Sequence, residues 1–136
     1  MEIISKSWNA FSKEIADEYL KTFGAPSSSA NEIIKDILPS LIRNKKSPSI
    51  LDLGCGNGHL YEFLNSHKEI KYTGVDFSKP LIEAARNNYY DANFVIADIN
   101  NLTKVLKNDF DLIIFSHVLE MLESPEKALF IARKFS

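Results

Sequence analysis

Apolar and polar positions along the chain follow first a helical period and then a strand-like one. From Ser7 to Phe23, apolar residues recur every three or four positions, which predicts an amphipathic helix. A second stripe with the same spacing runs from Ile33 to Ile42, and Ser29 with Glu32 forms a capping-box pattern ahead of it. Pro39 is expected to kink or interrupt this second helix.

After a basic, polar linker at 44–48, short β-rich runs alternate with helical segments. Strands are expected in SILDL (49–53), KYTGVD (71–76), NFVIAD (93–98) and DFDLIIFS (109–116). Helices are expected at 59–67, 79–88, 100–106, 117–122 and 125–135, with Ser78 and Ser124 as N-caps ahead of Pro80 and Pro125. This alternation predicts βαβ units, and so an α/β fold with a parallel sheet.

The composition limits the class of protein. With 136 residues, 45% of them hydrophobic, the chain is expected to form one domain, with N-terminal helices in 1–46 and an α/β core in 47–136. A formal net charge of -2 offers no basic field for a nucleic-acid backbone. Cys55 is the only cysteine, which favours a reducing compartment, and neither a secretory signal nor an apolar run of about 18 residues is found. A cytoplasmic protein is therefore expected.

The stretch LDLGCGNGHL (51–60) marks a ligand-binding loop. Gly54, Gly56 and Gly58 follow the first β-rich run, where glycines let a loop turn sharply and let a ligand approach the main chain. A dinucleotide-binding loop would have the spacing G-x-G-x-x-G, so the third glycine here comes one residue early. A P-loop would need Lys followed by Ser or Thr, whereas His59 and Leu60 follow here. An NAD-dependent enzyme remains only as a distant alternative.

Three carboxylates narrow the ligand further. Asp52, Asp76 and Asp98 each lie at or near the end of one of the first three expected strands, and no Lys or Arg lies between residues 50 and 62. A pyrophosphate would be repelled by Asp52, whereas a cationic group would be attracted. Because the carboxyl ends of parallel strands meet at one edge, these carboxylates suit a ligand with an ammonium group, a ribose and an adenine amino group.

At this point the chain from about 49 to 132 resembles the class I, Rossmann-like methyltransferases that depend on S-adenosylmethionine (SAM). The motifs that carry the resemblance are LDLGCGNG for the glycine loop, GVDFS for the ribose, VIADI for the adenine, and FDLIIFSHVLEML for the fourth strand and its helix. Four motifs in the expected order make the match specific. The resemblance implies a sheet with strand order 3-2-1-4, SAM as cofactor and methyl transfer to a small-molecule acceptor.

The resemblance also implies a role for each matching residue. Asp52 would help to hold the ammonium group, directly or through water, Asp76 would accept from both ribose hydroxyls, and Asp98 would accept from the adenine amino group. The full set of implied cofactor-binding residues is Asp52, Gly54, Cys55, Gly56, Asn57, Gly58, Asp76, Phe77, Ser78, Asp98, Ile99, Ser116 and His117. Among them, Phe77 would lie on one adenine face, the Ile99 backbone N–H and side chain would serve the ring, and Ser116 and His117 would border the sulfonium.

No catalytic side chain is required by this chemistry. SAM is an activated methyl donor, so the protein mainly aligns acceptor and methyl and excludes water. His117 is a weak candidate for a general base, because local hydrogen bonds explain a histidine there more simply. Glu120 is expected on the same helix face as His117, but this spacing alone does not indicate a shared role. Cys55 has no partner base and is assigned no chemistry, and no cluster has the spacing of a metal site.

The sequence matches only part of the family's fold. The family fold has seven strands, and this sequence supplies four, so the determinants of the acceptor are expected to lie largely elsewhere. The strand at 110–115 would then be an apolar edge that self-association or a partner chain covers. In families of this pattern an N-terminal aromatic helix commonly covers the cofactor, and Trp8 is the candidate for that role. A non-catalytic module that binds SAM, its product or a protein partner is the alternative to an enzyme.

Overall fold

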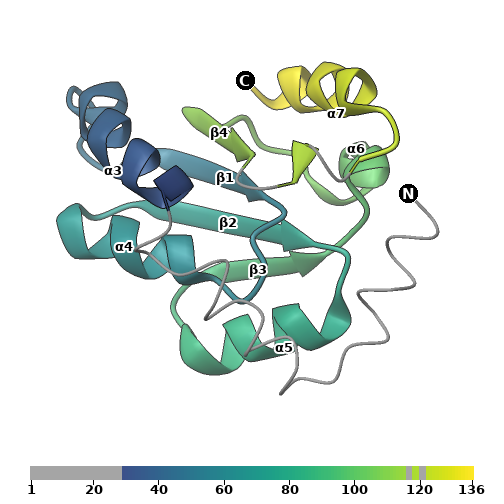
Figure 1. The fold of residues 1–136 in the computed structure, drawn as a ribbon, viewed down its shortest axis with the longest axis horizontal. Coiled ribbons are helices and arrows are strands. Elements are labelled where there is room, and N and C mark those ends of the chain that lie inside the picture. The colour runs from purple at the N-terminus through teal and green to yellow at the C-terminus, as the bar shows by residue number, and fades with distance from the viewer. Residues whose placement is uncertain (1–28, 116–117, 120–121) are drawn as a thin grey trace.

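The structure is a computed structural model, and it describes residues 29–115, 118–119 and 122–136. These residues form a four-stranded parallel sheet with helices on both faces (Figure 1). In chain order the main elements are α3 (Ser29–Ile42), β1 (Ser49–Leu53), α4 (His59–His67), β2 (Lys71–Asp76), α5 (Lys79–Asn88), β3 (Asn93–Ile96), α6 (Leu102–Val105), β4 (Leu112–Phe115) and α7 (Pro125–Ala132). The predicted α/β fold is confirmed. The helix predicted for 7–23, with Trp8, lies outside the described residues, as does much of the helix predicted for 117–122.

The strands are ordered β3-β2-β1-β4, as the resemblance implied, and each neighbouring pair is parallel. Asp52 of β1 is opposite Gly74 of β2 and Ile114 of β4. β3 ends at Ile96 and β4 spans four residues, so both strands are shorter than the β-rich runs that predict them. Parallel pairing brings the carboxyl ends of all four strands to one edge of the sheet, which is where ligands bind in open α/β sheets.

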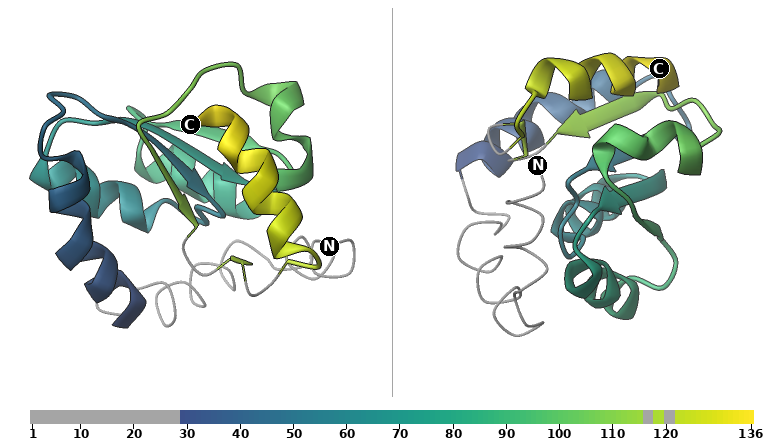
Figure 2. Two further views of the ribbon diagram at one scale, coloured as in Figure 1. Left: turned by 90° about the horizontal axis from the view of Figure 1, so that it is seen from above. Right: turned by 90° about the vertical axis from the view of Figure 1, so that its right-hand side faces the viewer.

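Helices cover both faces of the sheet (Figure 2), and each face carries its own apolar core. On one face, Ile50 and Tyr72 pack with residues of α3, α4 and α5. On the other face, Leu51, Leu53 and Val75 pack with residues of α6 and α7. Successive residues of β1 thus point to opposite faces and both are fully buried, as expected for a parallel sheet covered on both sides.

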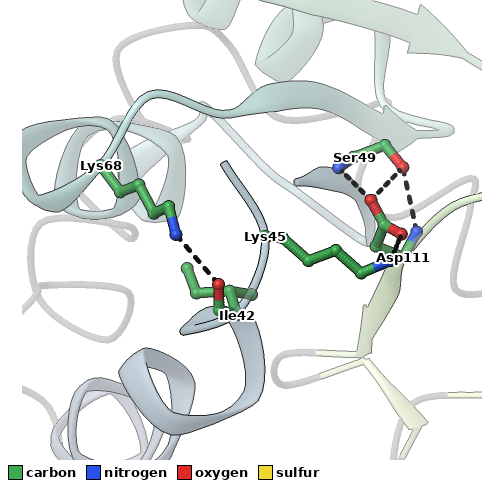
Figure 3. Close-up of polar contacts among 5 residues, drawn as sticks. All are labelled: Ile42, Lys45, Ser49, Lys68 and Asp111. Atoms are coloured by element: carbon green, nitrogen blue, oxygen red, sulfur yellow. Dashed lines mark hydrogen bonds and ion pairs between the residues drawn. The ribbon is translucent and has the colours of Figure 1, made fainter. Parts of the chain in front are cut away.

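Two groups of polar contacts connect the end of α3 and the segment after it to the rest of the fold (Figure 3). Lys68 donates from Nζ to the carbonyl of Ile42, 3.1 Å away, and so caps the end of α3. The Asp111 carboxylate accepts from the backbone N–H and the hydroxyl of Ser49, at 2.9 and 3.1 Å, and pairs with Lys45 at 3.0 Å. These contacts link the start of β1 to the segment that leads into β4.

Three sequence predictions need correction. Of the kink or interruption predicted at Pro39, the interruption does not occur, because α3 continues to Ile42 and the side chains of Leu38 and Ile42, on either side of the proline, are buried in the core. The helix predicted for 100–106 is a 3₁₀ turn at Ile99–Asn101 followed by the four-residue α6. The helix predicted for 125–135 is α helix only to Ala132 and ends in a 3₁₀ turn.

Candidate functional site

The glycine loop after β1 adopts a conformation that residues with side chains rarely take. Gly54, Gly56 and Gly58 have φ angles of +80°, +56° and +88°. The N–H groups of Gly54 and Cys55 both donate to the carbonyl of Val75, at 2.8 and 3.1 Å, so the loop starts tied to β2. Gly58 is the N-cap of α4. The loop therefore passes sharply from strand to helix through a backbone that residues with a Cβ rarely adopt.

Asp76, at the end of β2, is bound to the middle of this loop. Its Oδ2 accepts from the backbone N–H of Gly56 at 3.0 Å, and its Oδ1 accepts from the backbone N–H of Ser78 at 2.8 Å. Burial raises the pKa of the Asp76 carboxyl, while the bonds from Ser78 and Gly56 act in the opposite direction. A carboxylate has about four acceptor positions. The two N–H groups therefore leave acceptor capacity on both oxygens.

Asp52 lies in β1, two residues before Gly54, and is 1% exposed. Its Oδ2 accepts from the hydroxyl of Tyr72 at 2.5 Å. Burial raises the pKa of the Asp52 carboxyl to about 7, the bond from Tyr72 lowers it, and the negative charge of Asp76 raises it. This carboxyl is consequently poised between its neutral and charged forms near neutral pH, and a nearby cation would favour the charged form.

Asp98 and Ile99 begin the 3₁₀ turn after β3. Asp98 accepts through Oδ1 from the backbone N–H and the side-chain amide of Asn100, at 2.8 and 3.0 Å. Both of these bonds use one oxygen of the carboxylate. Ile99 is buried, at 5% exposure, against the α6 and α7 core. The edge thus presents a carboxylate beside an apolar side chain, a combination that suits a flat ring bearing an amino group.

Buried oxygen atoms without a hydrogen-bond partner collect at this edge. In the part of the chain that the structure describes, four such side-chain atoms occur. Three of them belong to predicted site residues: Asp52 Oδ1, Asn57 Oδ1 and Ser78 Oγ. Ser78 occupies the predicted N-cap position of α5 but its side chain makes no capping bond, and Ser124 of α7 behaves in the same way. Buried polar groups in native proteins are nearly always paired, so this concentration points to a polar ligand.

Cys55 has a packing role in this loop. Its Sγ would lie 2.8 Å from a Cβ placed on Gly74, so the thiol fills the space that the glycine leaves open. Burial and the charges of Asp76 and Asp52 raise the pKa of the Cys55 thiol well above its ordinary value. The thiol therefore stays protonated at neutral pH, which makes it a poor nucleophile.

The described residues line hollows on two sides of the sheet. One of about 80 Å³ lies between the 3₁₀ turn and the start of α7, with Ile99, Asn100, Ser124 and Lys127 in its lining. The other, of about 180 Å³, is apolar and lies between the ends of α3 and α4, where the chain leads into β1 and β2. The larger hollow is therefore at the opposite edge of the sheet from the carboxylates and is not part of this site.

The structure brings the predicted residues of the first three strand ends to one edge, and Phe77 follows Asp76 there, half-buried. Ser116, His117 and Glu120 lie outside the described residues. Within the described ranges, no group of three His, Cys, Asp or Glu residues could hold a metal ion. The same residues include no helix of the length and apolarity needed to cross a membrane.

Tyr72 is the site residue that sequence reasoning missed. It lies opposite Ile50, two positions before Gly74, on the same face of β2 as Asp76. From there its ring reaches diagonally to Asp52 on the neighbouring strand, a distance that aromatic side chains span. A two-residue alternation along KYTGVD puts Tyr72 on the carboxylate face. Only the register between β1 and β2, however, shows that its hydroxyl meets Asp52.

Comparison with known proteins shows the family of this chain. A family model described as a methyltransferase domain matches residues 50–135, more than half of the chain. The chain belongs to this family of methyltransferase domains, as the motifs predicted. The family is the SAM-dependent one with the Rossmann-like fold that the sequence resembles.

Curated relatives match with moderate identity and are longer than this chain. A ubiquinone biosynthesis O-methyltransferase of Coxiella burnetii (strain RSA 493 / Nine Mile phase I) is 38% identical over 88 residues, covering 62% of this chain and 37% of the relative. A malonyl-[acyl-carrier protein] O-methyltransferase of Paenibacillus sp. (strain JDR-2) is 27% identical over 133 residues, covering 92% and 48%. The chain thus spans less than half the length of these relatives.

Solved structures support the fold. The plantazolicin methyltransferase BpumL in complex with S-adenosylhomocysteine (SAH) has a TM-score of 0.75 and 24% identity, over 96% of this chain and 52% of that chain. Magnesium protoporphyrin IX methyltransferase from Synechocystis PCC 6803 with bound SAM has a TM-score of 0.76 and 16% identity, over 99% and 71%. Because both identities are below 25%, the likeness shows a shared fold and nothing about the substrate.

Proposed function

We propose that this chain carries the SAM-binding site of a SAM-dependent methyltransferase that acts on a small-molecule acceptor. The observation that carries the proposal is the group of three unpartnered buried oxygens, on Asp52, Asn57 and Ser78, beside a glycine loop with three positive φ angles. Family membership supports the same assignment. These residues fit a ligand that has both a cationic end and hydroxyl groups.

The roles of individual residues follow from the contacts. Asp52 receives the ammonium group of the cofactor, because its Oδ1 is buried and has no hydrogen-bond partner among the described residues. Asp76 accepts from the two ribose hydroxyls with the positions that Gly56 and Ser78 leave open. Asp98 accepts from the adenine amino group through its second oxygen, and Phe77 and Ile99 contact the adenine ring.

The part played by the protein in catalysis is positioning. When bound, SAM supplies a methyl group on a sulfonium, which is already activated toward a nucleophile. The described residues hold the adenosine and amino-acid ends at fixed points on the edge of the sheet. Ser116 and His117 stay predictions for the border of the methyl group.

The acceptor is proposed to be a small molecule that is methylated on oxygen. Two curated relatives that match this chain are named as O-methyltransferases. The net charge of -2 does not favour a nucleic-acid acceptor. A cytoplasmic location stays a prediction.

The test is calorimetric titration of the chain with SAH, compared with Asp76→Ala and with Asp109→Ala as a matched control. Asp109 is an exposed aspartate that precedes β4, away from the strand ends that form the site. We expect saturable binding that is retained in the control and weakened about 100-fold or more in Asp76→Ala, since two charge-assisted hydrogen bonds are lost. Binding without methyl transfer to any oxygen acceptor in a screen would favour the non-catalytic alternative. A folded wild-type chain that does not bind SAH would contradict the proposal.

We also propose that another strand pairs with the outer edge of β4. In the described sheet, β4 pairs only with β1, and its apolar residues Leu112, Ile113 and Phe115 are half-buried. An exposed apolar edge strand favours pairing with a second chain. Light scattering after size-exclusion chromatography tests this. A dimer is the expected result, and a monodisperse wild-type monomer at micromolar concentration would contradict it.

A further inference from the structure

A buried hydrogen bond between two strands lies behind the proposed ammonium site. Tyr72 and Asp52 are 5% and 1% exposed, and the tyrosine hydroxyl donates to Asp52 Oδ2 at 2.5 Å. The other oxygen, Oδ1, is buried and has no partner among the described residues. The bond therefore orients the carboxyl group of Asp52 and leaves Oδ1 available to a ligand.

The charged and titratable groups that act on Asp52 in the described part of the chain come from β2 and from the glycine loop. Tyr72 donates to it, Asp76 repels its negative charge, and the neutral thiol of Cys55 lies nearby in the loop. Of these three groups, only Tyr72 favours the ionised carboxylate. Without that hydroxyl, burial and Asp76 would act on Asp52 unopposed, and the neutral acid would persist to a higher pH.

We propose that Tyr72 is a positioning residue of the cofactor site, which orients Asp52 and favours the charged form that receives the ammonium group. The inference rests on the proposed function, since it assumes that the amino-acid end of the cofactor binds at Asp52. Binding then includes a proton transfer: Asp52 Oδ1 loses its proton to the buffer, and the resulting carboxylate pairs with the ammonium group. No atom other than this proton is exchanged.

This linkage has a sign that can be measured. Below neutral pH, Asp52 is largely protonated in the free protein, so the cofactor must displace a proton and affinity falls as the pH falls. In Tyr72→Phe the hydrogen bond that favours the carboxylate is gone, so the same loss of affinity begins at a higher pH. The ligand's own ammonium group titrates identically against both proteins, so the ratio of their Kd values isolates Asp52.

The experiment is calorimetry of the whole chain with SAH and with 5′-methylthioadenosine, which has the adenosine and sulfur of SAH but no ammonium group. Wild type, Tyr72→Phe and Tyr90→Phe are compared; Tyr90 is 93% exposed and serves as the matched control. Near pH 6.5 we expect Tyr72→Phe to bind SAH about tenfold more weakly than wild type, with the gap closing toward about pH 9. Binding of methylthioadenosine should be equal in all three proteins at every pH.

A second measurement does not depend on the variant. Repeating the wild-type SAH titration near pH 6.5 in buffers of different ionisation enthalpy counts the protons released, and we expect about half a proton or more per SAH, against none for methylthioadenosine. A merely structural role for Tyr72 would weaken both ligands equally at every pH, and that result would overturn the inference. So would SAH binding without proton release. If wild type binds neither ligand, the proposed function itself fails. If wild type binds SAH but the ratio of the Kd values of Tyr72→Phe and wild type does not change with pH, only the inference about Tyr72 fails.

Discussion

Asp76 accepts a hydrogen bond from the backbone N–H of Gly56, 3.0 Å away, and this bond joins the end of β2 to the middle of the loop after β1. The same carboxylate accepts from Ser78 N–H, so one side chain holds two loops that come from different strands. The residue that we propose to bind the ribose therefore also shapes the loop that we propose to bind the amino-acid end. Folding of the edge and recognition of the cofactor depend on the same group.

The first prediction concerns this double role. In Asp76→Asn, the amide can accept from only one of the two N–H groups, because its nitrogen is itself a donor. One buried N–H then lacks an acceptor, and we expect the free energy of unfolding to fall by about 1–3 kcal/mol. Urea denaturation measures the change, with Asp109→Asn as control. Equal stability of the two variants would mean that Asp76 does not organise the loops.

A second prediction concerns Gly54, whose φ is +80°. An added Cβ would lie 2.8 Å from Cβ and Cγ2 of Val118, so Gly54→Ala introduces both backbone strain and a steric clash. We expect a loss of about 2–4 kcal/mol in the free energy of unfolding. In a Val118→Ala background the clash is partly relieved, so the same substitution should cost about 1 kcal/mol less. Additive effects in this double-mutant cycle would contradict the close approach of Val118 to the loop.

The sequence predicted the fold and the gathering of three carboxylates at one edge of the sheet, and the reasons are physical. Parallel strands must end at one edge, so Asp52, Asp76 and Asp98 could be brought together from the period of the pattern alone. The bond from Tyr72 could not be foreseen, because it depends on the register of β1 against β2. The sequence pattern also could not predict that α3 continues past Pro39, because this depends on the tertiary packing of the residues on both sides of the proline.

A third prediction uses Asp111, which accepts from Ser49 and pairs with Lys45. These interactions lower the pKa of the Asp111 carboxyl to about 2, with the bond from the Ser49 backbone as the largest cause. A depressed pKa stabilises the folded protein above the ordinary value near 4, and the stabilisation disappears as the pH falls toward 2. Asp111→Asn should therefore have a lower urea midpoint than wild type at pH 7, with a difference that shrinks between about pH 4 and 2. A difference that stays constant over this range would show that the charge of Asp111 is not involved.

The last prediction follows from the opposite shift at Asp52. Burial raises the pKa of this carboxyl from 3.8 to about 7, so between these values the unfolded chain has lost the proton while the folded chain still holds it. The unfolded state then binds fewer protons than the folded state, and stability falls as the pH rises through this window. Asp52→Asn removes this titrating group. A tenfold change in proton affinity corresponds to about 1.4 kcal/mol. Between pH 4 and pH 8, the free energy of unfolding of wild type should therefore fall by on the order of 2–4 kcal/mol relative to that of the variant.

The same variant should bind SAH at least about tenfold more weakly at pH 8, because a neutral amide cannot neutralise an ammonium group. Urea unfolding at a series of pH values gives the first quantity and calorimetry gives the second. Asp109→Asn, which replaces an exposed aspartate, should show neither effect. If Asp52→Asn becomes more stable relative to wild type as the pH rises, and also binds SAH more weakly, the Asp52 carboxylate destabilises the fold but is needed for its charge in ligand binding. Parallel pH profiles for Asp52→Asn and wild type would instead mean that Asp52 is ionised throughout, and that Tyr72 holds a permanent carboxylate.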